Sequence, residues 1–292
     1  MRNLKRALSL ALAAIMLIGM MVVSASAVSY NDLTDKDQIV NKDAVSMLVS
    51  LGIIEGKPDG SYAPTENVDR AQMAKMLSVI MNKGVDNSAL YQSVNSGLTD
   101  ITSHWAKGHI NYCYTTGIIA GRGNGKFDPS ATVTALEAAK MLLVAVGYDP
   151  AIEGFEGADW AINVSVRADE QGIFEGFTKD LSAPLNRDDA ALLIYNALDV
   201  EMIQSYTTNN YPIAYSDHRT ILADKYGVIK VQGVVVANEW ASLASDDGDA
   251  ALKEGKTTIY NGEGIFSTTG NTTVSKEDAS LKTQTFNVST PV

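Results

Sequence analysis

The chain is constrained most strongly by a glycine-bounded pentapeptide that occurs three times in one register. Aligning Gly52, Gly117 and Gly172 superimposes the segments GIIEG, GIIAG and GIFEG. The register extends upstream, because a matched position stands twelve residues before each glycine: Val40, Trp105 and Trp160. Self-similarity over such a distance indicates repeated supersecondary units rather than a chance match.

Each copy has the pattern of a helix, a turn and a second helix. In the middle copy we expect a first helix over residues 104–116, ending at Gly117, and then a loop rich in Gly, Asn and Pro. Each second helix begins with the residue pair of a capping box, in which two side chains satisfy free backbone N–H groups. The pairs are Asp69 with Gln72, Thr134 with Glu137, and Asn186 with Asp189.

Apolar residues recur at helical spacing behind each capping pair, so each second helix carries one apolar stripe. Helices of about twelve residues are marginal in water unless such a stripe is buried. We therefore predict a mainly α fold, in which three helix-turn-helix repeats form a pseudo-threefold, three-pronged module with the second helices at its centre. The predicted repeats span residues 28–83, 98–148 and 152–200.

The first 27 residues have the three parts of a secretory signal peptide. Basic residues are followed by an apolar run and then by the small-residue cleavage signal Ala25-Ser26-Ala27. No other run approaches the length needed to cross a membrane. We expect an exported mature chain without a membrane span.

Composition narrows the partners of the exported chain. Its 34 acidic residues outnumber 23 basic ones, which argues against nucleic acid as a partner. Such a chain is also repelled at long range by an anionic polymer, so any binding to one must come from a few focused cations. The single cysteine, Cys113, cannot form an internal disulfide and is expected as a small buried hydrophobe.

Motifs for an enzyme are missing from the sequence. Its three histidines do not form a zinc-protease grouping, and it has no nucleophile elbow, phosphate-binding loop or dinucleotide fingerprint. We therefore expect no catalytic residues, no metal site and no cofactor.

The motifs resemble those of the S-layer homology family, which typically occurs as three tandem repeats. The resemblance covers roughly residues 30–200 and rests on His104-Trp105-Ala106, the three pentapeptides, and the helix starts VDRAQ, VTALE and LNRDD. It implies a helical module that binds, without covalent bonds, the secondary polysaccharide of a Gram-positive-type cell wall, often through pyruvylated sugars. The implied location is secreted, in the cell wall or surface layer.

The candidate binding cations are Arg70 and Arg187, which stand directly after their capping residues. A positive charge at a helix N-terminus is unfavourable, so local structure alone does not select it. Binding of an anion would favour an arginine here, because free N–H groups, the helix dipole and a guanidinium then converge on one carboxylate. A salt bridge to a neighbouring prong is the alternative. The second copy has Ala135 at this position, so its groove either binds no anion or borrows Lys107, Arg122 or Lys126.

The remaining site candidates follow the motifs. Trp105 and Trp160 either pack in the core or stack on a sugar face, and the sequence leaves both readings open. The second glycines of the pentapeptides are expected at positive φ, and the resemblance implies that their loops line the grooves: Gly56, Gly121 and Gly176. Asp59 is first a turn residue and only then a possible contributor to binding.

After residue 200 the pattern changes to a small β-rich region, predicted over residues 206–292. We expect a polar connector over 206–215, a short helix over 221–225, and strands within 228–236, 257–260, 264–267 and 283–288. So little β structure suggests the front part of a longer surface protein.

Two functions are compatible with this sequence. In the first, the repeats anchor an exported protein to the wall polysaccharide. In the second, the chain is a structural surface-layer subunit whose main role is self-assembly through the β-rich region.

Overall fold

The computed structural model describes residues 29–228 and the three strands at 234–237, 256–260 and 283–287. The chain divides into two units, residues 1–227 and 228–292. The predicted signal peptide and the predicted strand at 264–267 lie outside the described residues.

The first unit is mainly helical, as expected from the sequence. Its α-helices are α2 (Lys42–Ser50), α3 (Arg70–Met81), α4 (Lys107–Thr115), α5 (Ala135–Val146), α6 (Trp160–Glu170), α7 (Arg187–Ala197) and α8 (Ile221–Tyr226). Short 3-10 helices are η1 (Tyr30–Asp32), η2 (Lys36–Gln38) and η3 (Ser88–Tyr91). A hairpin of β1 (Ile203–Tyr206) and β2 (Pro212–Ala214) precedes α8.

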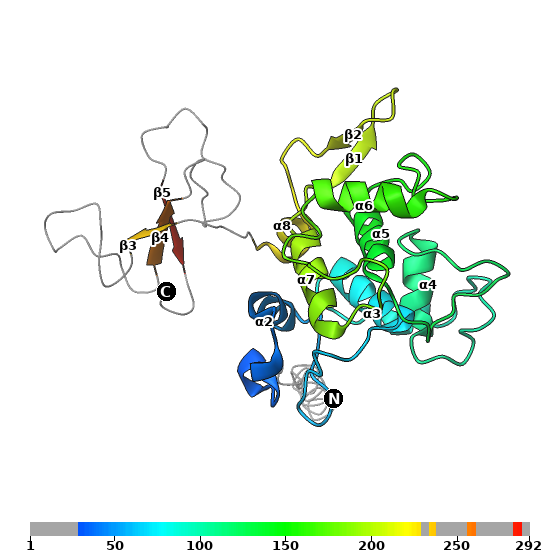
Figure 1. The fold of residues 1–292 in the computed structure, drawn as a ribbon, viewed down its shortest axis with the longest axis horizontal. Coiled ribbons are helices and arrows are strands. Elements are labelled where there is room, and N and C mark those ends of the chain that lie inside the picture. Colours follow the sequence, from blue (N-terminus) through cyan, green and yellow to red (C-terminus); the bar gives the residue numbers. More distant parts are fainter. Residues whose placement is uncertain (1–28, 229–233, 238–255, 261–282, 288–292) are drawn as a thin grey trace, which may run out of the picture. The chain divides into compact units, whose positions relative to one another are not determined.

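Three helix pairs, α2 with α3, α4 with α5, and α6 with α7, repeat around a common centre. Each second helix packs against the first helix of the next pair, so α3 contacts α4, α5 contacts α6, and α7 contacts α2. Figure 1 shows α2, α4 and α6 on the outside of α3, α5 and α7. Each prong therefore depends on a neighbouring repeat for its packing, as the short apolar stripes predicted.

A closed ring of backbone hydrogen bonds joins the three repeats just before the second helices. Val68 N donates to Leu185 O, Leu185 N donates to Val133 O, and Val133 N donates to Val68 O, at 2.8–2.9 Å. All three side chains are buried. Because each residue donates once and accepts once, the third copy is as integral to the ring as the first two.

A carboxylate fixes the loop between the helices in each of the first two repeats. Asp35 accepts from the backbone N–H groups of Tyr62 and Ala63, and Asp100 accepts from those of Phe127 and Asp128. Ala63 and Asp128 have positive φ, at 56° and 62°. The carboxylates thus hold two matching loops in a backbone conformation that non-glycine residues rarely adopt.

Helix starts confirm most of the capping predictions. Asp69 with Gln72 and Thr134 with Glu137 form complete capping boxes. The third is incomplete, because Asn186 caps the N–H of Asp189 whereas the Asp189 carboxylate pairs with Lys179.

The first helix of the middle copy begins at Lys107 rather than at His104. The reason is local, because residues 101–104 form a turn and the His104 ring accepts from the N–H of Ala106.

The segment expected as a polar connector instead supplies strand β2 and the end of β1. Tyr206 explains how the hairpin is held, since its hydroxyl donates to Glu153 and accepts from the N–H of Asp149. The short helix predicted at 221–225 is confirmed as α8, which buries Ile221 and Leu222.

The second unit contains a three-stranded antiparallel sheet within its described residues. Strand β4 (Lys256–Tyr260) lies between β3 (Val234–Ala237) and β5 (Thr283–Asn287). Strands were predicted at all three places, which confirms β structure after the helical repeats.

Replacing Asp100 by Ala tests how much the loop carboxylates stabilise the fold. We expect the free energy of unfolding to fall by about 1–3 kcal/mol, because two backbone N–H groups lose a charged acceptor. Urea unfolding measures the change. Asp37→Ala, at an exposed position, is the control and should change stability by less than about 0.5 kcal/mol; equal effects would contradict this role for Asp100.

Candidate functional site

A groove of about 350 Å³ lies where three repeats meet. The first repeat contributes Arg70 from α3, and the third contributes residues 155–157 and Trp160. The second contributes its pentapeptide loop and the α5 residues Glu137, Lys140 and Met141. We call this the Arg70 groove. It brings together three of the residues predicted for binding, Arg70, Gly121 and Trp160.

Arg70 is fixed by the neighbouring repeat. Its side chain donates from Nε to Phe127 O at 2.8 Å and from Nη2 to Ala120 O at 2.9 Å, and its guanidinium lies 4.4 Å from the centroid of the Phe127 ring. The residue is only 5% exposed, and burial lowers its pKa to about 10, with a further lowering from the nearby Arg122. Arg70 therefore fastens two repeats together and presents its remaining edge to the groove.

The expectation that free helix N–H groups bind an anion is wrong. Arg70 N donates to Ala131 O, Ala71 N donates to Pro129 O, and Gln72 N donates to the capping carboxylate of Asp69. The first N–H groups of α3 are thus occupied by the next repeat. An anion in the groove must rely on side-chain cations instead.

Arg187 repeats the arrangement between the third and first repeats. It donates to Tyr62 O and Glu55 O, and its guanidinium lies 4.7 Å from the centroid of the Tyr62 ring. The alternative of a salt bridge to a neighbouring prong is replaced in both cases by bonds to carbonyl oxygens and a cation–π contact. We use the name Arg187 groove for the four residues that match Arg70, Gly121, Lys140 and Trp160 around the ring, namely Arg187, Gly56, Lys75 and Trp105.

The junction between the second and third repeats lacks this contact. Ala135 is fully buried, and the position that matches Phe127 and Tyr62 is Lys179, which pairs with Asp189. Of the cations proposed as substitutes, Arg122 lies in the Arg70 groove and pairs with Glu137 at 2.8 Å. It does not serve the Ala135 position.

Lys140 is a groove residue that the sequence reasoning missed. Its ammonium lies 5.7 Å from the centroid of the Trp160 ring and donates to Phe155 O. Among the described residues no carboxylate lies within salt-bridge distance of it, and burial lowers its pKa. The signal was available, because Lys75 occupies the matching position five residues after Arg70.

The two tryptophans differ in exposure. Trp105 is 56% exposed, so the core reading is wrong for it, whereas Trp160 is half-buried at the wall of the Arg70 groove. The matching residue of the first repeat, Val40, is 81% exposed. Both tryptophans are exposed enough for a sugar ring to stack on them.

The glycine prediction is correct at one of its three positions. Gly176 has φ 76°, but Gly56 and Gly121 are not among the described glycines with positive φ; the first glycines of the pentapeptides are, at 69°, 79° and 70°. Gly121 is required for a different reason, since a Cβ there would lie 2.8 Å from Lys126 O.

Asp59 is the exposed turn residue that was expected. It accepts from the N–H and hydroxyl of Ser61, and these bonds lower its pKa. It is not among the residues that line the Arg70 groove.

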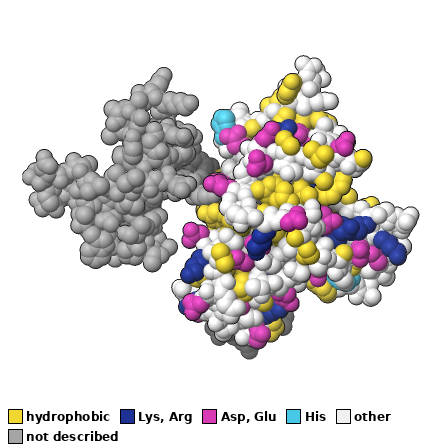
Figure 2. All heavy atoms as spheres, in the orientation of Figure 1, with side chains coloured by type: hydrophobic (Ala, Val, Ile, Leu, Met, Phe, Trp, Pro, Cys, Tyr) yellow, Lys and Arg dark blue, Asp and Glu magenta, His cyan; other side chains and the backbone are white. Residues whose placement is uncertain are grey.

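On the face shown in Figure 2, basic side chains form several small groups separated by acidic and hydrophobic ones. This distribution agrees with binding through focused cations rather than a broad basic surface. In the described part of the chain, no group of His, Cys, Asp and Glu could hold a metal ion. Within the same residues, no helix is both long and apolar enough to cross a bilayer.

Comparison with known proteins finds a domain family similar to two segments of the chain. Two segments of the chain match the S-layer homology domain, residues 29–74 and 97–139. They cover most of the first two predicted repeats. The third repeat is outside the match, although it completes the hydrogen-bonded ring.

The similar proteins are named as surface proteins, S-layer proteins and enzymes. A cell surface protein of Thermoanaerobacter kivui is 28% identical over 273 residues, 92% of this chain and 32% of the relative. The S-layer protein EA1 of Bacillus anthracis is 32% identical over 111 residues, 38% of this chain and 12% of the relative. Exoglucanase XynX of Acetivibrio thermocellus is 28% identical over 192 residues, 61% of this chain and 17% of the relative. The chain thus spans about a third or less of the length of these relatives.

Substituting Arg70 by Ala should destabilise the fold. We expect a loss of about 2–4 kcal/mol, because two carbonyl oxygens lose a charged donor and the Phe127 ring loses its cation. Chemical denaturation checks this. The control is Arg122→Ala, which removes a half-exposed ion pair and should cost less than about 1 kcal/mol; similar losses in both variants would contradict the fastening role.

Proposed function

We propose that the helical repeats bind a secondary cell-wall polysaccharide, carrying pyruvylated sugars, in the grooves between them, and so anchor an exported protein to the wall. In this proposal all three repeats, including the third, are S-layer homology repeats. The proposal is supported above all by the Arg70 groove, where an arginine, a tryptophan and an ammonium that has no salt bridge to a described carboxylate face one space.

The chemistry of this groove suits an acidic sugar. Lys140 and the free edge of Arg70 supply positive charge to a ketal carboxylate in a half-enclosed space, where charges interact more strongly than in water. Trp160 offers an aromatic face to the sugar ring. Two carboxylates also line the groove, Glu137, which pairs with Arg122, and Glu156, whose charge acts on Lys140.

We infer that two of the three grooves bind. By the symmetry of the ring, each groove takes one residue from each of four matched positions, on all three repeats. The Arg70 groove has Arg70, Gly121, Lys140 and Trp160, and the Arg187 groove has Arg187, Gly56, Lys75 and Trp105. The third groove collects Ala135, Gly176, Leu192 and Val40.

The three departures from the pattern thus fall in the same groove. A Cβ atom added to Gly176 would lie 3.8 Å from the Leu192 side chain. Gly176 and Leu192 are therefore neighbours, which supports placing them in one groove. The four matched positions of the third groove therefore hold no arginine, lysine or tryptophan.

The location follows from the comparisons. The two S-layer homology segments and the relatives named as cell surface and S-layer proteins support a secreted, cell-wall-associated chain. Other relatives, similar to this chain over part of their length, are named as a cell wall amidase, an exoglucanase and an amylopullulanase. A wall anchor shared by such different proteins fits a binding role for the repeats.

The second candidate is a structural surface-layer subunit that acts mainly by self-assembly. It is favoured by relatives named as S-layer proteins. In that case the sheet unit would carry the lateral contacts, and removal of residues 228–292 would disrupt particles without changing wall binding.

Co-sedimentation of the secreted chain with isolated wall sacculi tests the anchor. We expect binding to untreated walls and its loss after mild acid has removed pyruvyl ketals. Absence of binding to untreated walls would sink the proposal, and binding that survives acid would exclude the ketal as the recognised group.

Variants of the Arg70 groove test the residues. Lys140→Met and Trp160→Ala should each weaken wall binding at least about tenfold, because loss of one of two grooves removes the gain from bivalent binding. Val40→Ala and Leu192→Met, in the third groove, are the matched controls and should leave binding unchanged. Equal losses in all four variants would contradict the two-groove assignment.

A further inference from the structure

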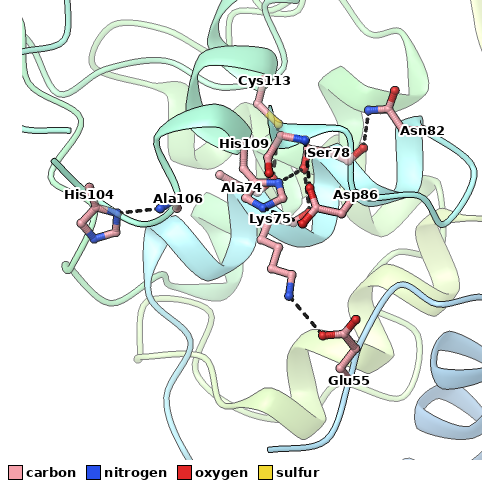
Figure 3. A network of polar contacts seen from close by, with 11 residues as sticks. Glu55, Ala74, Lys75, Ser78, Asn82, Asp86, His104, Ala106, His109 and Cys113 are labelled. Atoms are coloured by element: carbon pink, nitrogen blue, oxygen red, sulfur yellow. Dashed lines mark hydrogen bonds and ion pairs between the residues drawn. The ribbon is translucent and has the colours of Figure 1, made fainter. Parts of the chain in front are cut away.

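A buried histidine lies beside Trp105, a residue of the Arg187 groove. His109 of α4 is 4% exposed, and its Nδ1 lies 2.6 Å from the Oγ of Ser78 on α3. Its Nε2 lies 3.6 Å from a carboxylate oxygen of Asp86, in the segment after α3. Figure 3 shows these side chains meeting between the two helices.

The surroundings of His109 are compatible with both its neutral and its protonated form. Ser78 Oγ can donate to Lys75 O, at 2.9 Å, and then accepts from Nδ1–H of the histidine. In that neutral form, Nε2 presents a lone pair to the Asp86 carboxylate. A proton on Nε2 replaces this repulsion by an ion pair, so the ring is drawn toward Asp86 when it becomes charged.

The cluster reaches two residues of the Arg187 groove. The Trp105 ring lies edge-on to His109, with centroids 6.3 Å apart, and its other neighbour is the His104 ring at 5.6 Å. Lys75, whose charge acts on His109, pairs at 3.3 Å with Glu55 of the groove loop. Figure 3 shows Lys75 extending from the cluster to Glu55.

The matching helix pair does without these polar groups. Between α5 and α6, Leu143 stands at the position of Ser78 and Val164 at the position of His109, and both are fully buried. Apolar packing therefore suffices to join such a pair. The histidine cluster adds something to the Arg187 groove that the Arg70 groove lacks.

We propose that His109 is a positioning residue for Trp105 and Lys75, and that its protonation at mildly acidic pH weakens ligand binding in the Arg187 groove but not in the Arg70 groove. The proposal rests on the anchoring function above. Protonation moves the His109 ring, which contacts the Trp105 ring, and it places a buried positive charge beside Lys75.

The pH range follows from the surroundings of the ring. Burial lowers the pKa of His109, Asp86 raises it, and Lys75 lowers it again, with a net shift below the ordinary value of 6.5. Cys113 on the same helix stays neutral, since burial raises the pKa of its thiol. A lowered histidine pKa means that the folded state takes up its proton only below the unfolded value. Stability is therefore complete above pH 6.5 and declines as the pH falls below it.

Wall binding measured against pH, with one groove disabled at a time, tests the proposal. With Trp160→Ala, binding through the Arg187 groove should weaken about tenfold between about pH 7.5 and about pH 5. With Trp105→Ala, binding through the Arg70 groove should stay constant. A flat profile in the first background, or the same decline in both, would overturn the proposal.

Two further variants identify the titrating group. The double variant Ser78→Leu/His109→Val reproduces the Leu143–Val164 pair and should remove the pH dependence in the Trp160→Ala background. Asp86→Asn keeps the histidine and should move the midpoint to lower pH, because the counter-charge that favours the imidazolium is gone. An unchanged midpoint would contradict the role of this cluster.

Fluorescence separates failure of this proposal from failure of the anchor. In a chain with Trp160→Phe and Trp240→Phe, the emission of Trp105 should titrate with pH, and the double variant should abolish that titration. If the wild-type chain binds no wall at any pH, the anchoring function alone is contradicted. If the Trp105 emission does not change with pH, the positioning role of His109 is contradicted.

Discussion

The structure depends on a ring of three backbone hydrogen bonds that no single repeat can make. Val68, Val133 and Leu185 each donate to one neighbour and accept from another, directly before the second helices. The helix N-termini that follow are then satisfied by carbonyl oxygens of the next repeat. Because the ring closes only with three members, the prongs fold as one module, and the Arg70 groove is made from all three repeats.

This arrangement explains why arginine follows the cap in two repeats. At Arg70 and Arg187 the unfavourable placement near a helix N-terminus is offset by two carbonyl acceptors and an aromatic face from the adjacent repeat. Arg70 also borders the Arg70 groove. Under the proposed function its replacement would change stability and binding together, so Lys140 and Trp160 are the cleaner probes of binding.

The repeat register, the helix pairs and the pseudo-threefold centre could be predicted, because capping residues and apolar spacing are local signals. The groove could be predicted only in part, since it joins side chains of different repeats. Arg70 and Trp160 were found through their motifs. Lys140 was missed, because its importance comes from Trp160 across the repeat boundary, and the occupation of the α3 N–H groups by Pro129 and Ala131 left no sign in the sequence. The exposure of Trp105 also depends on tertiary contacts.

The central claim is that the module has two working grooves and one that has lost its binding groups. Calorimetric titration of the secreted chain with fragments of the wall polysaccharide counts them directly. The account predicts two fragments bound per chain, falling to one in Trp160→Ala. Three fragments per chain would show that the groove of Ala135, Leu192 and Val40 also binds, and none would contradict the anchor itself.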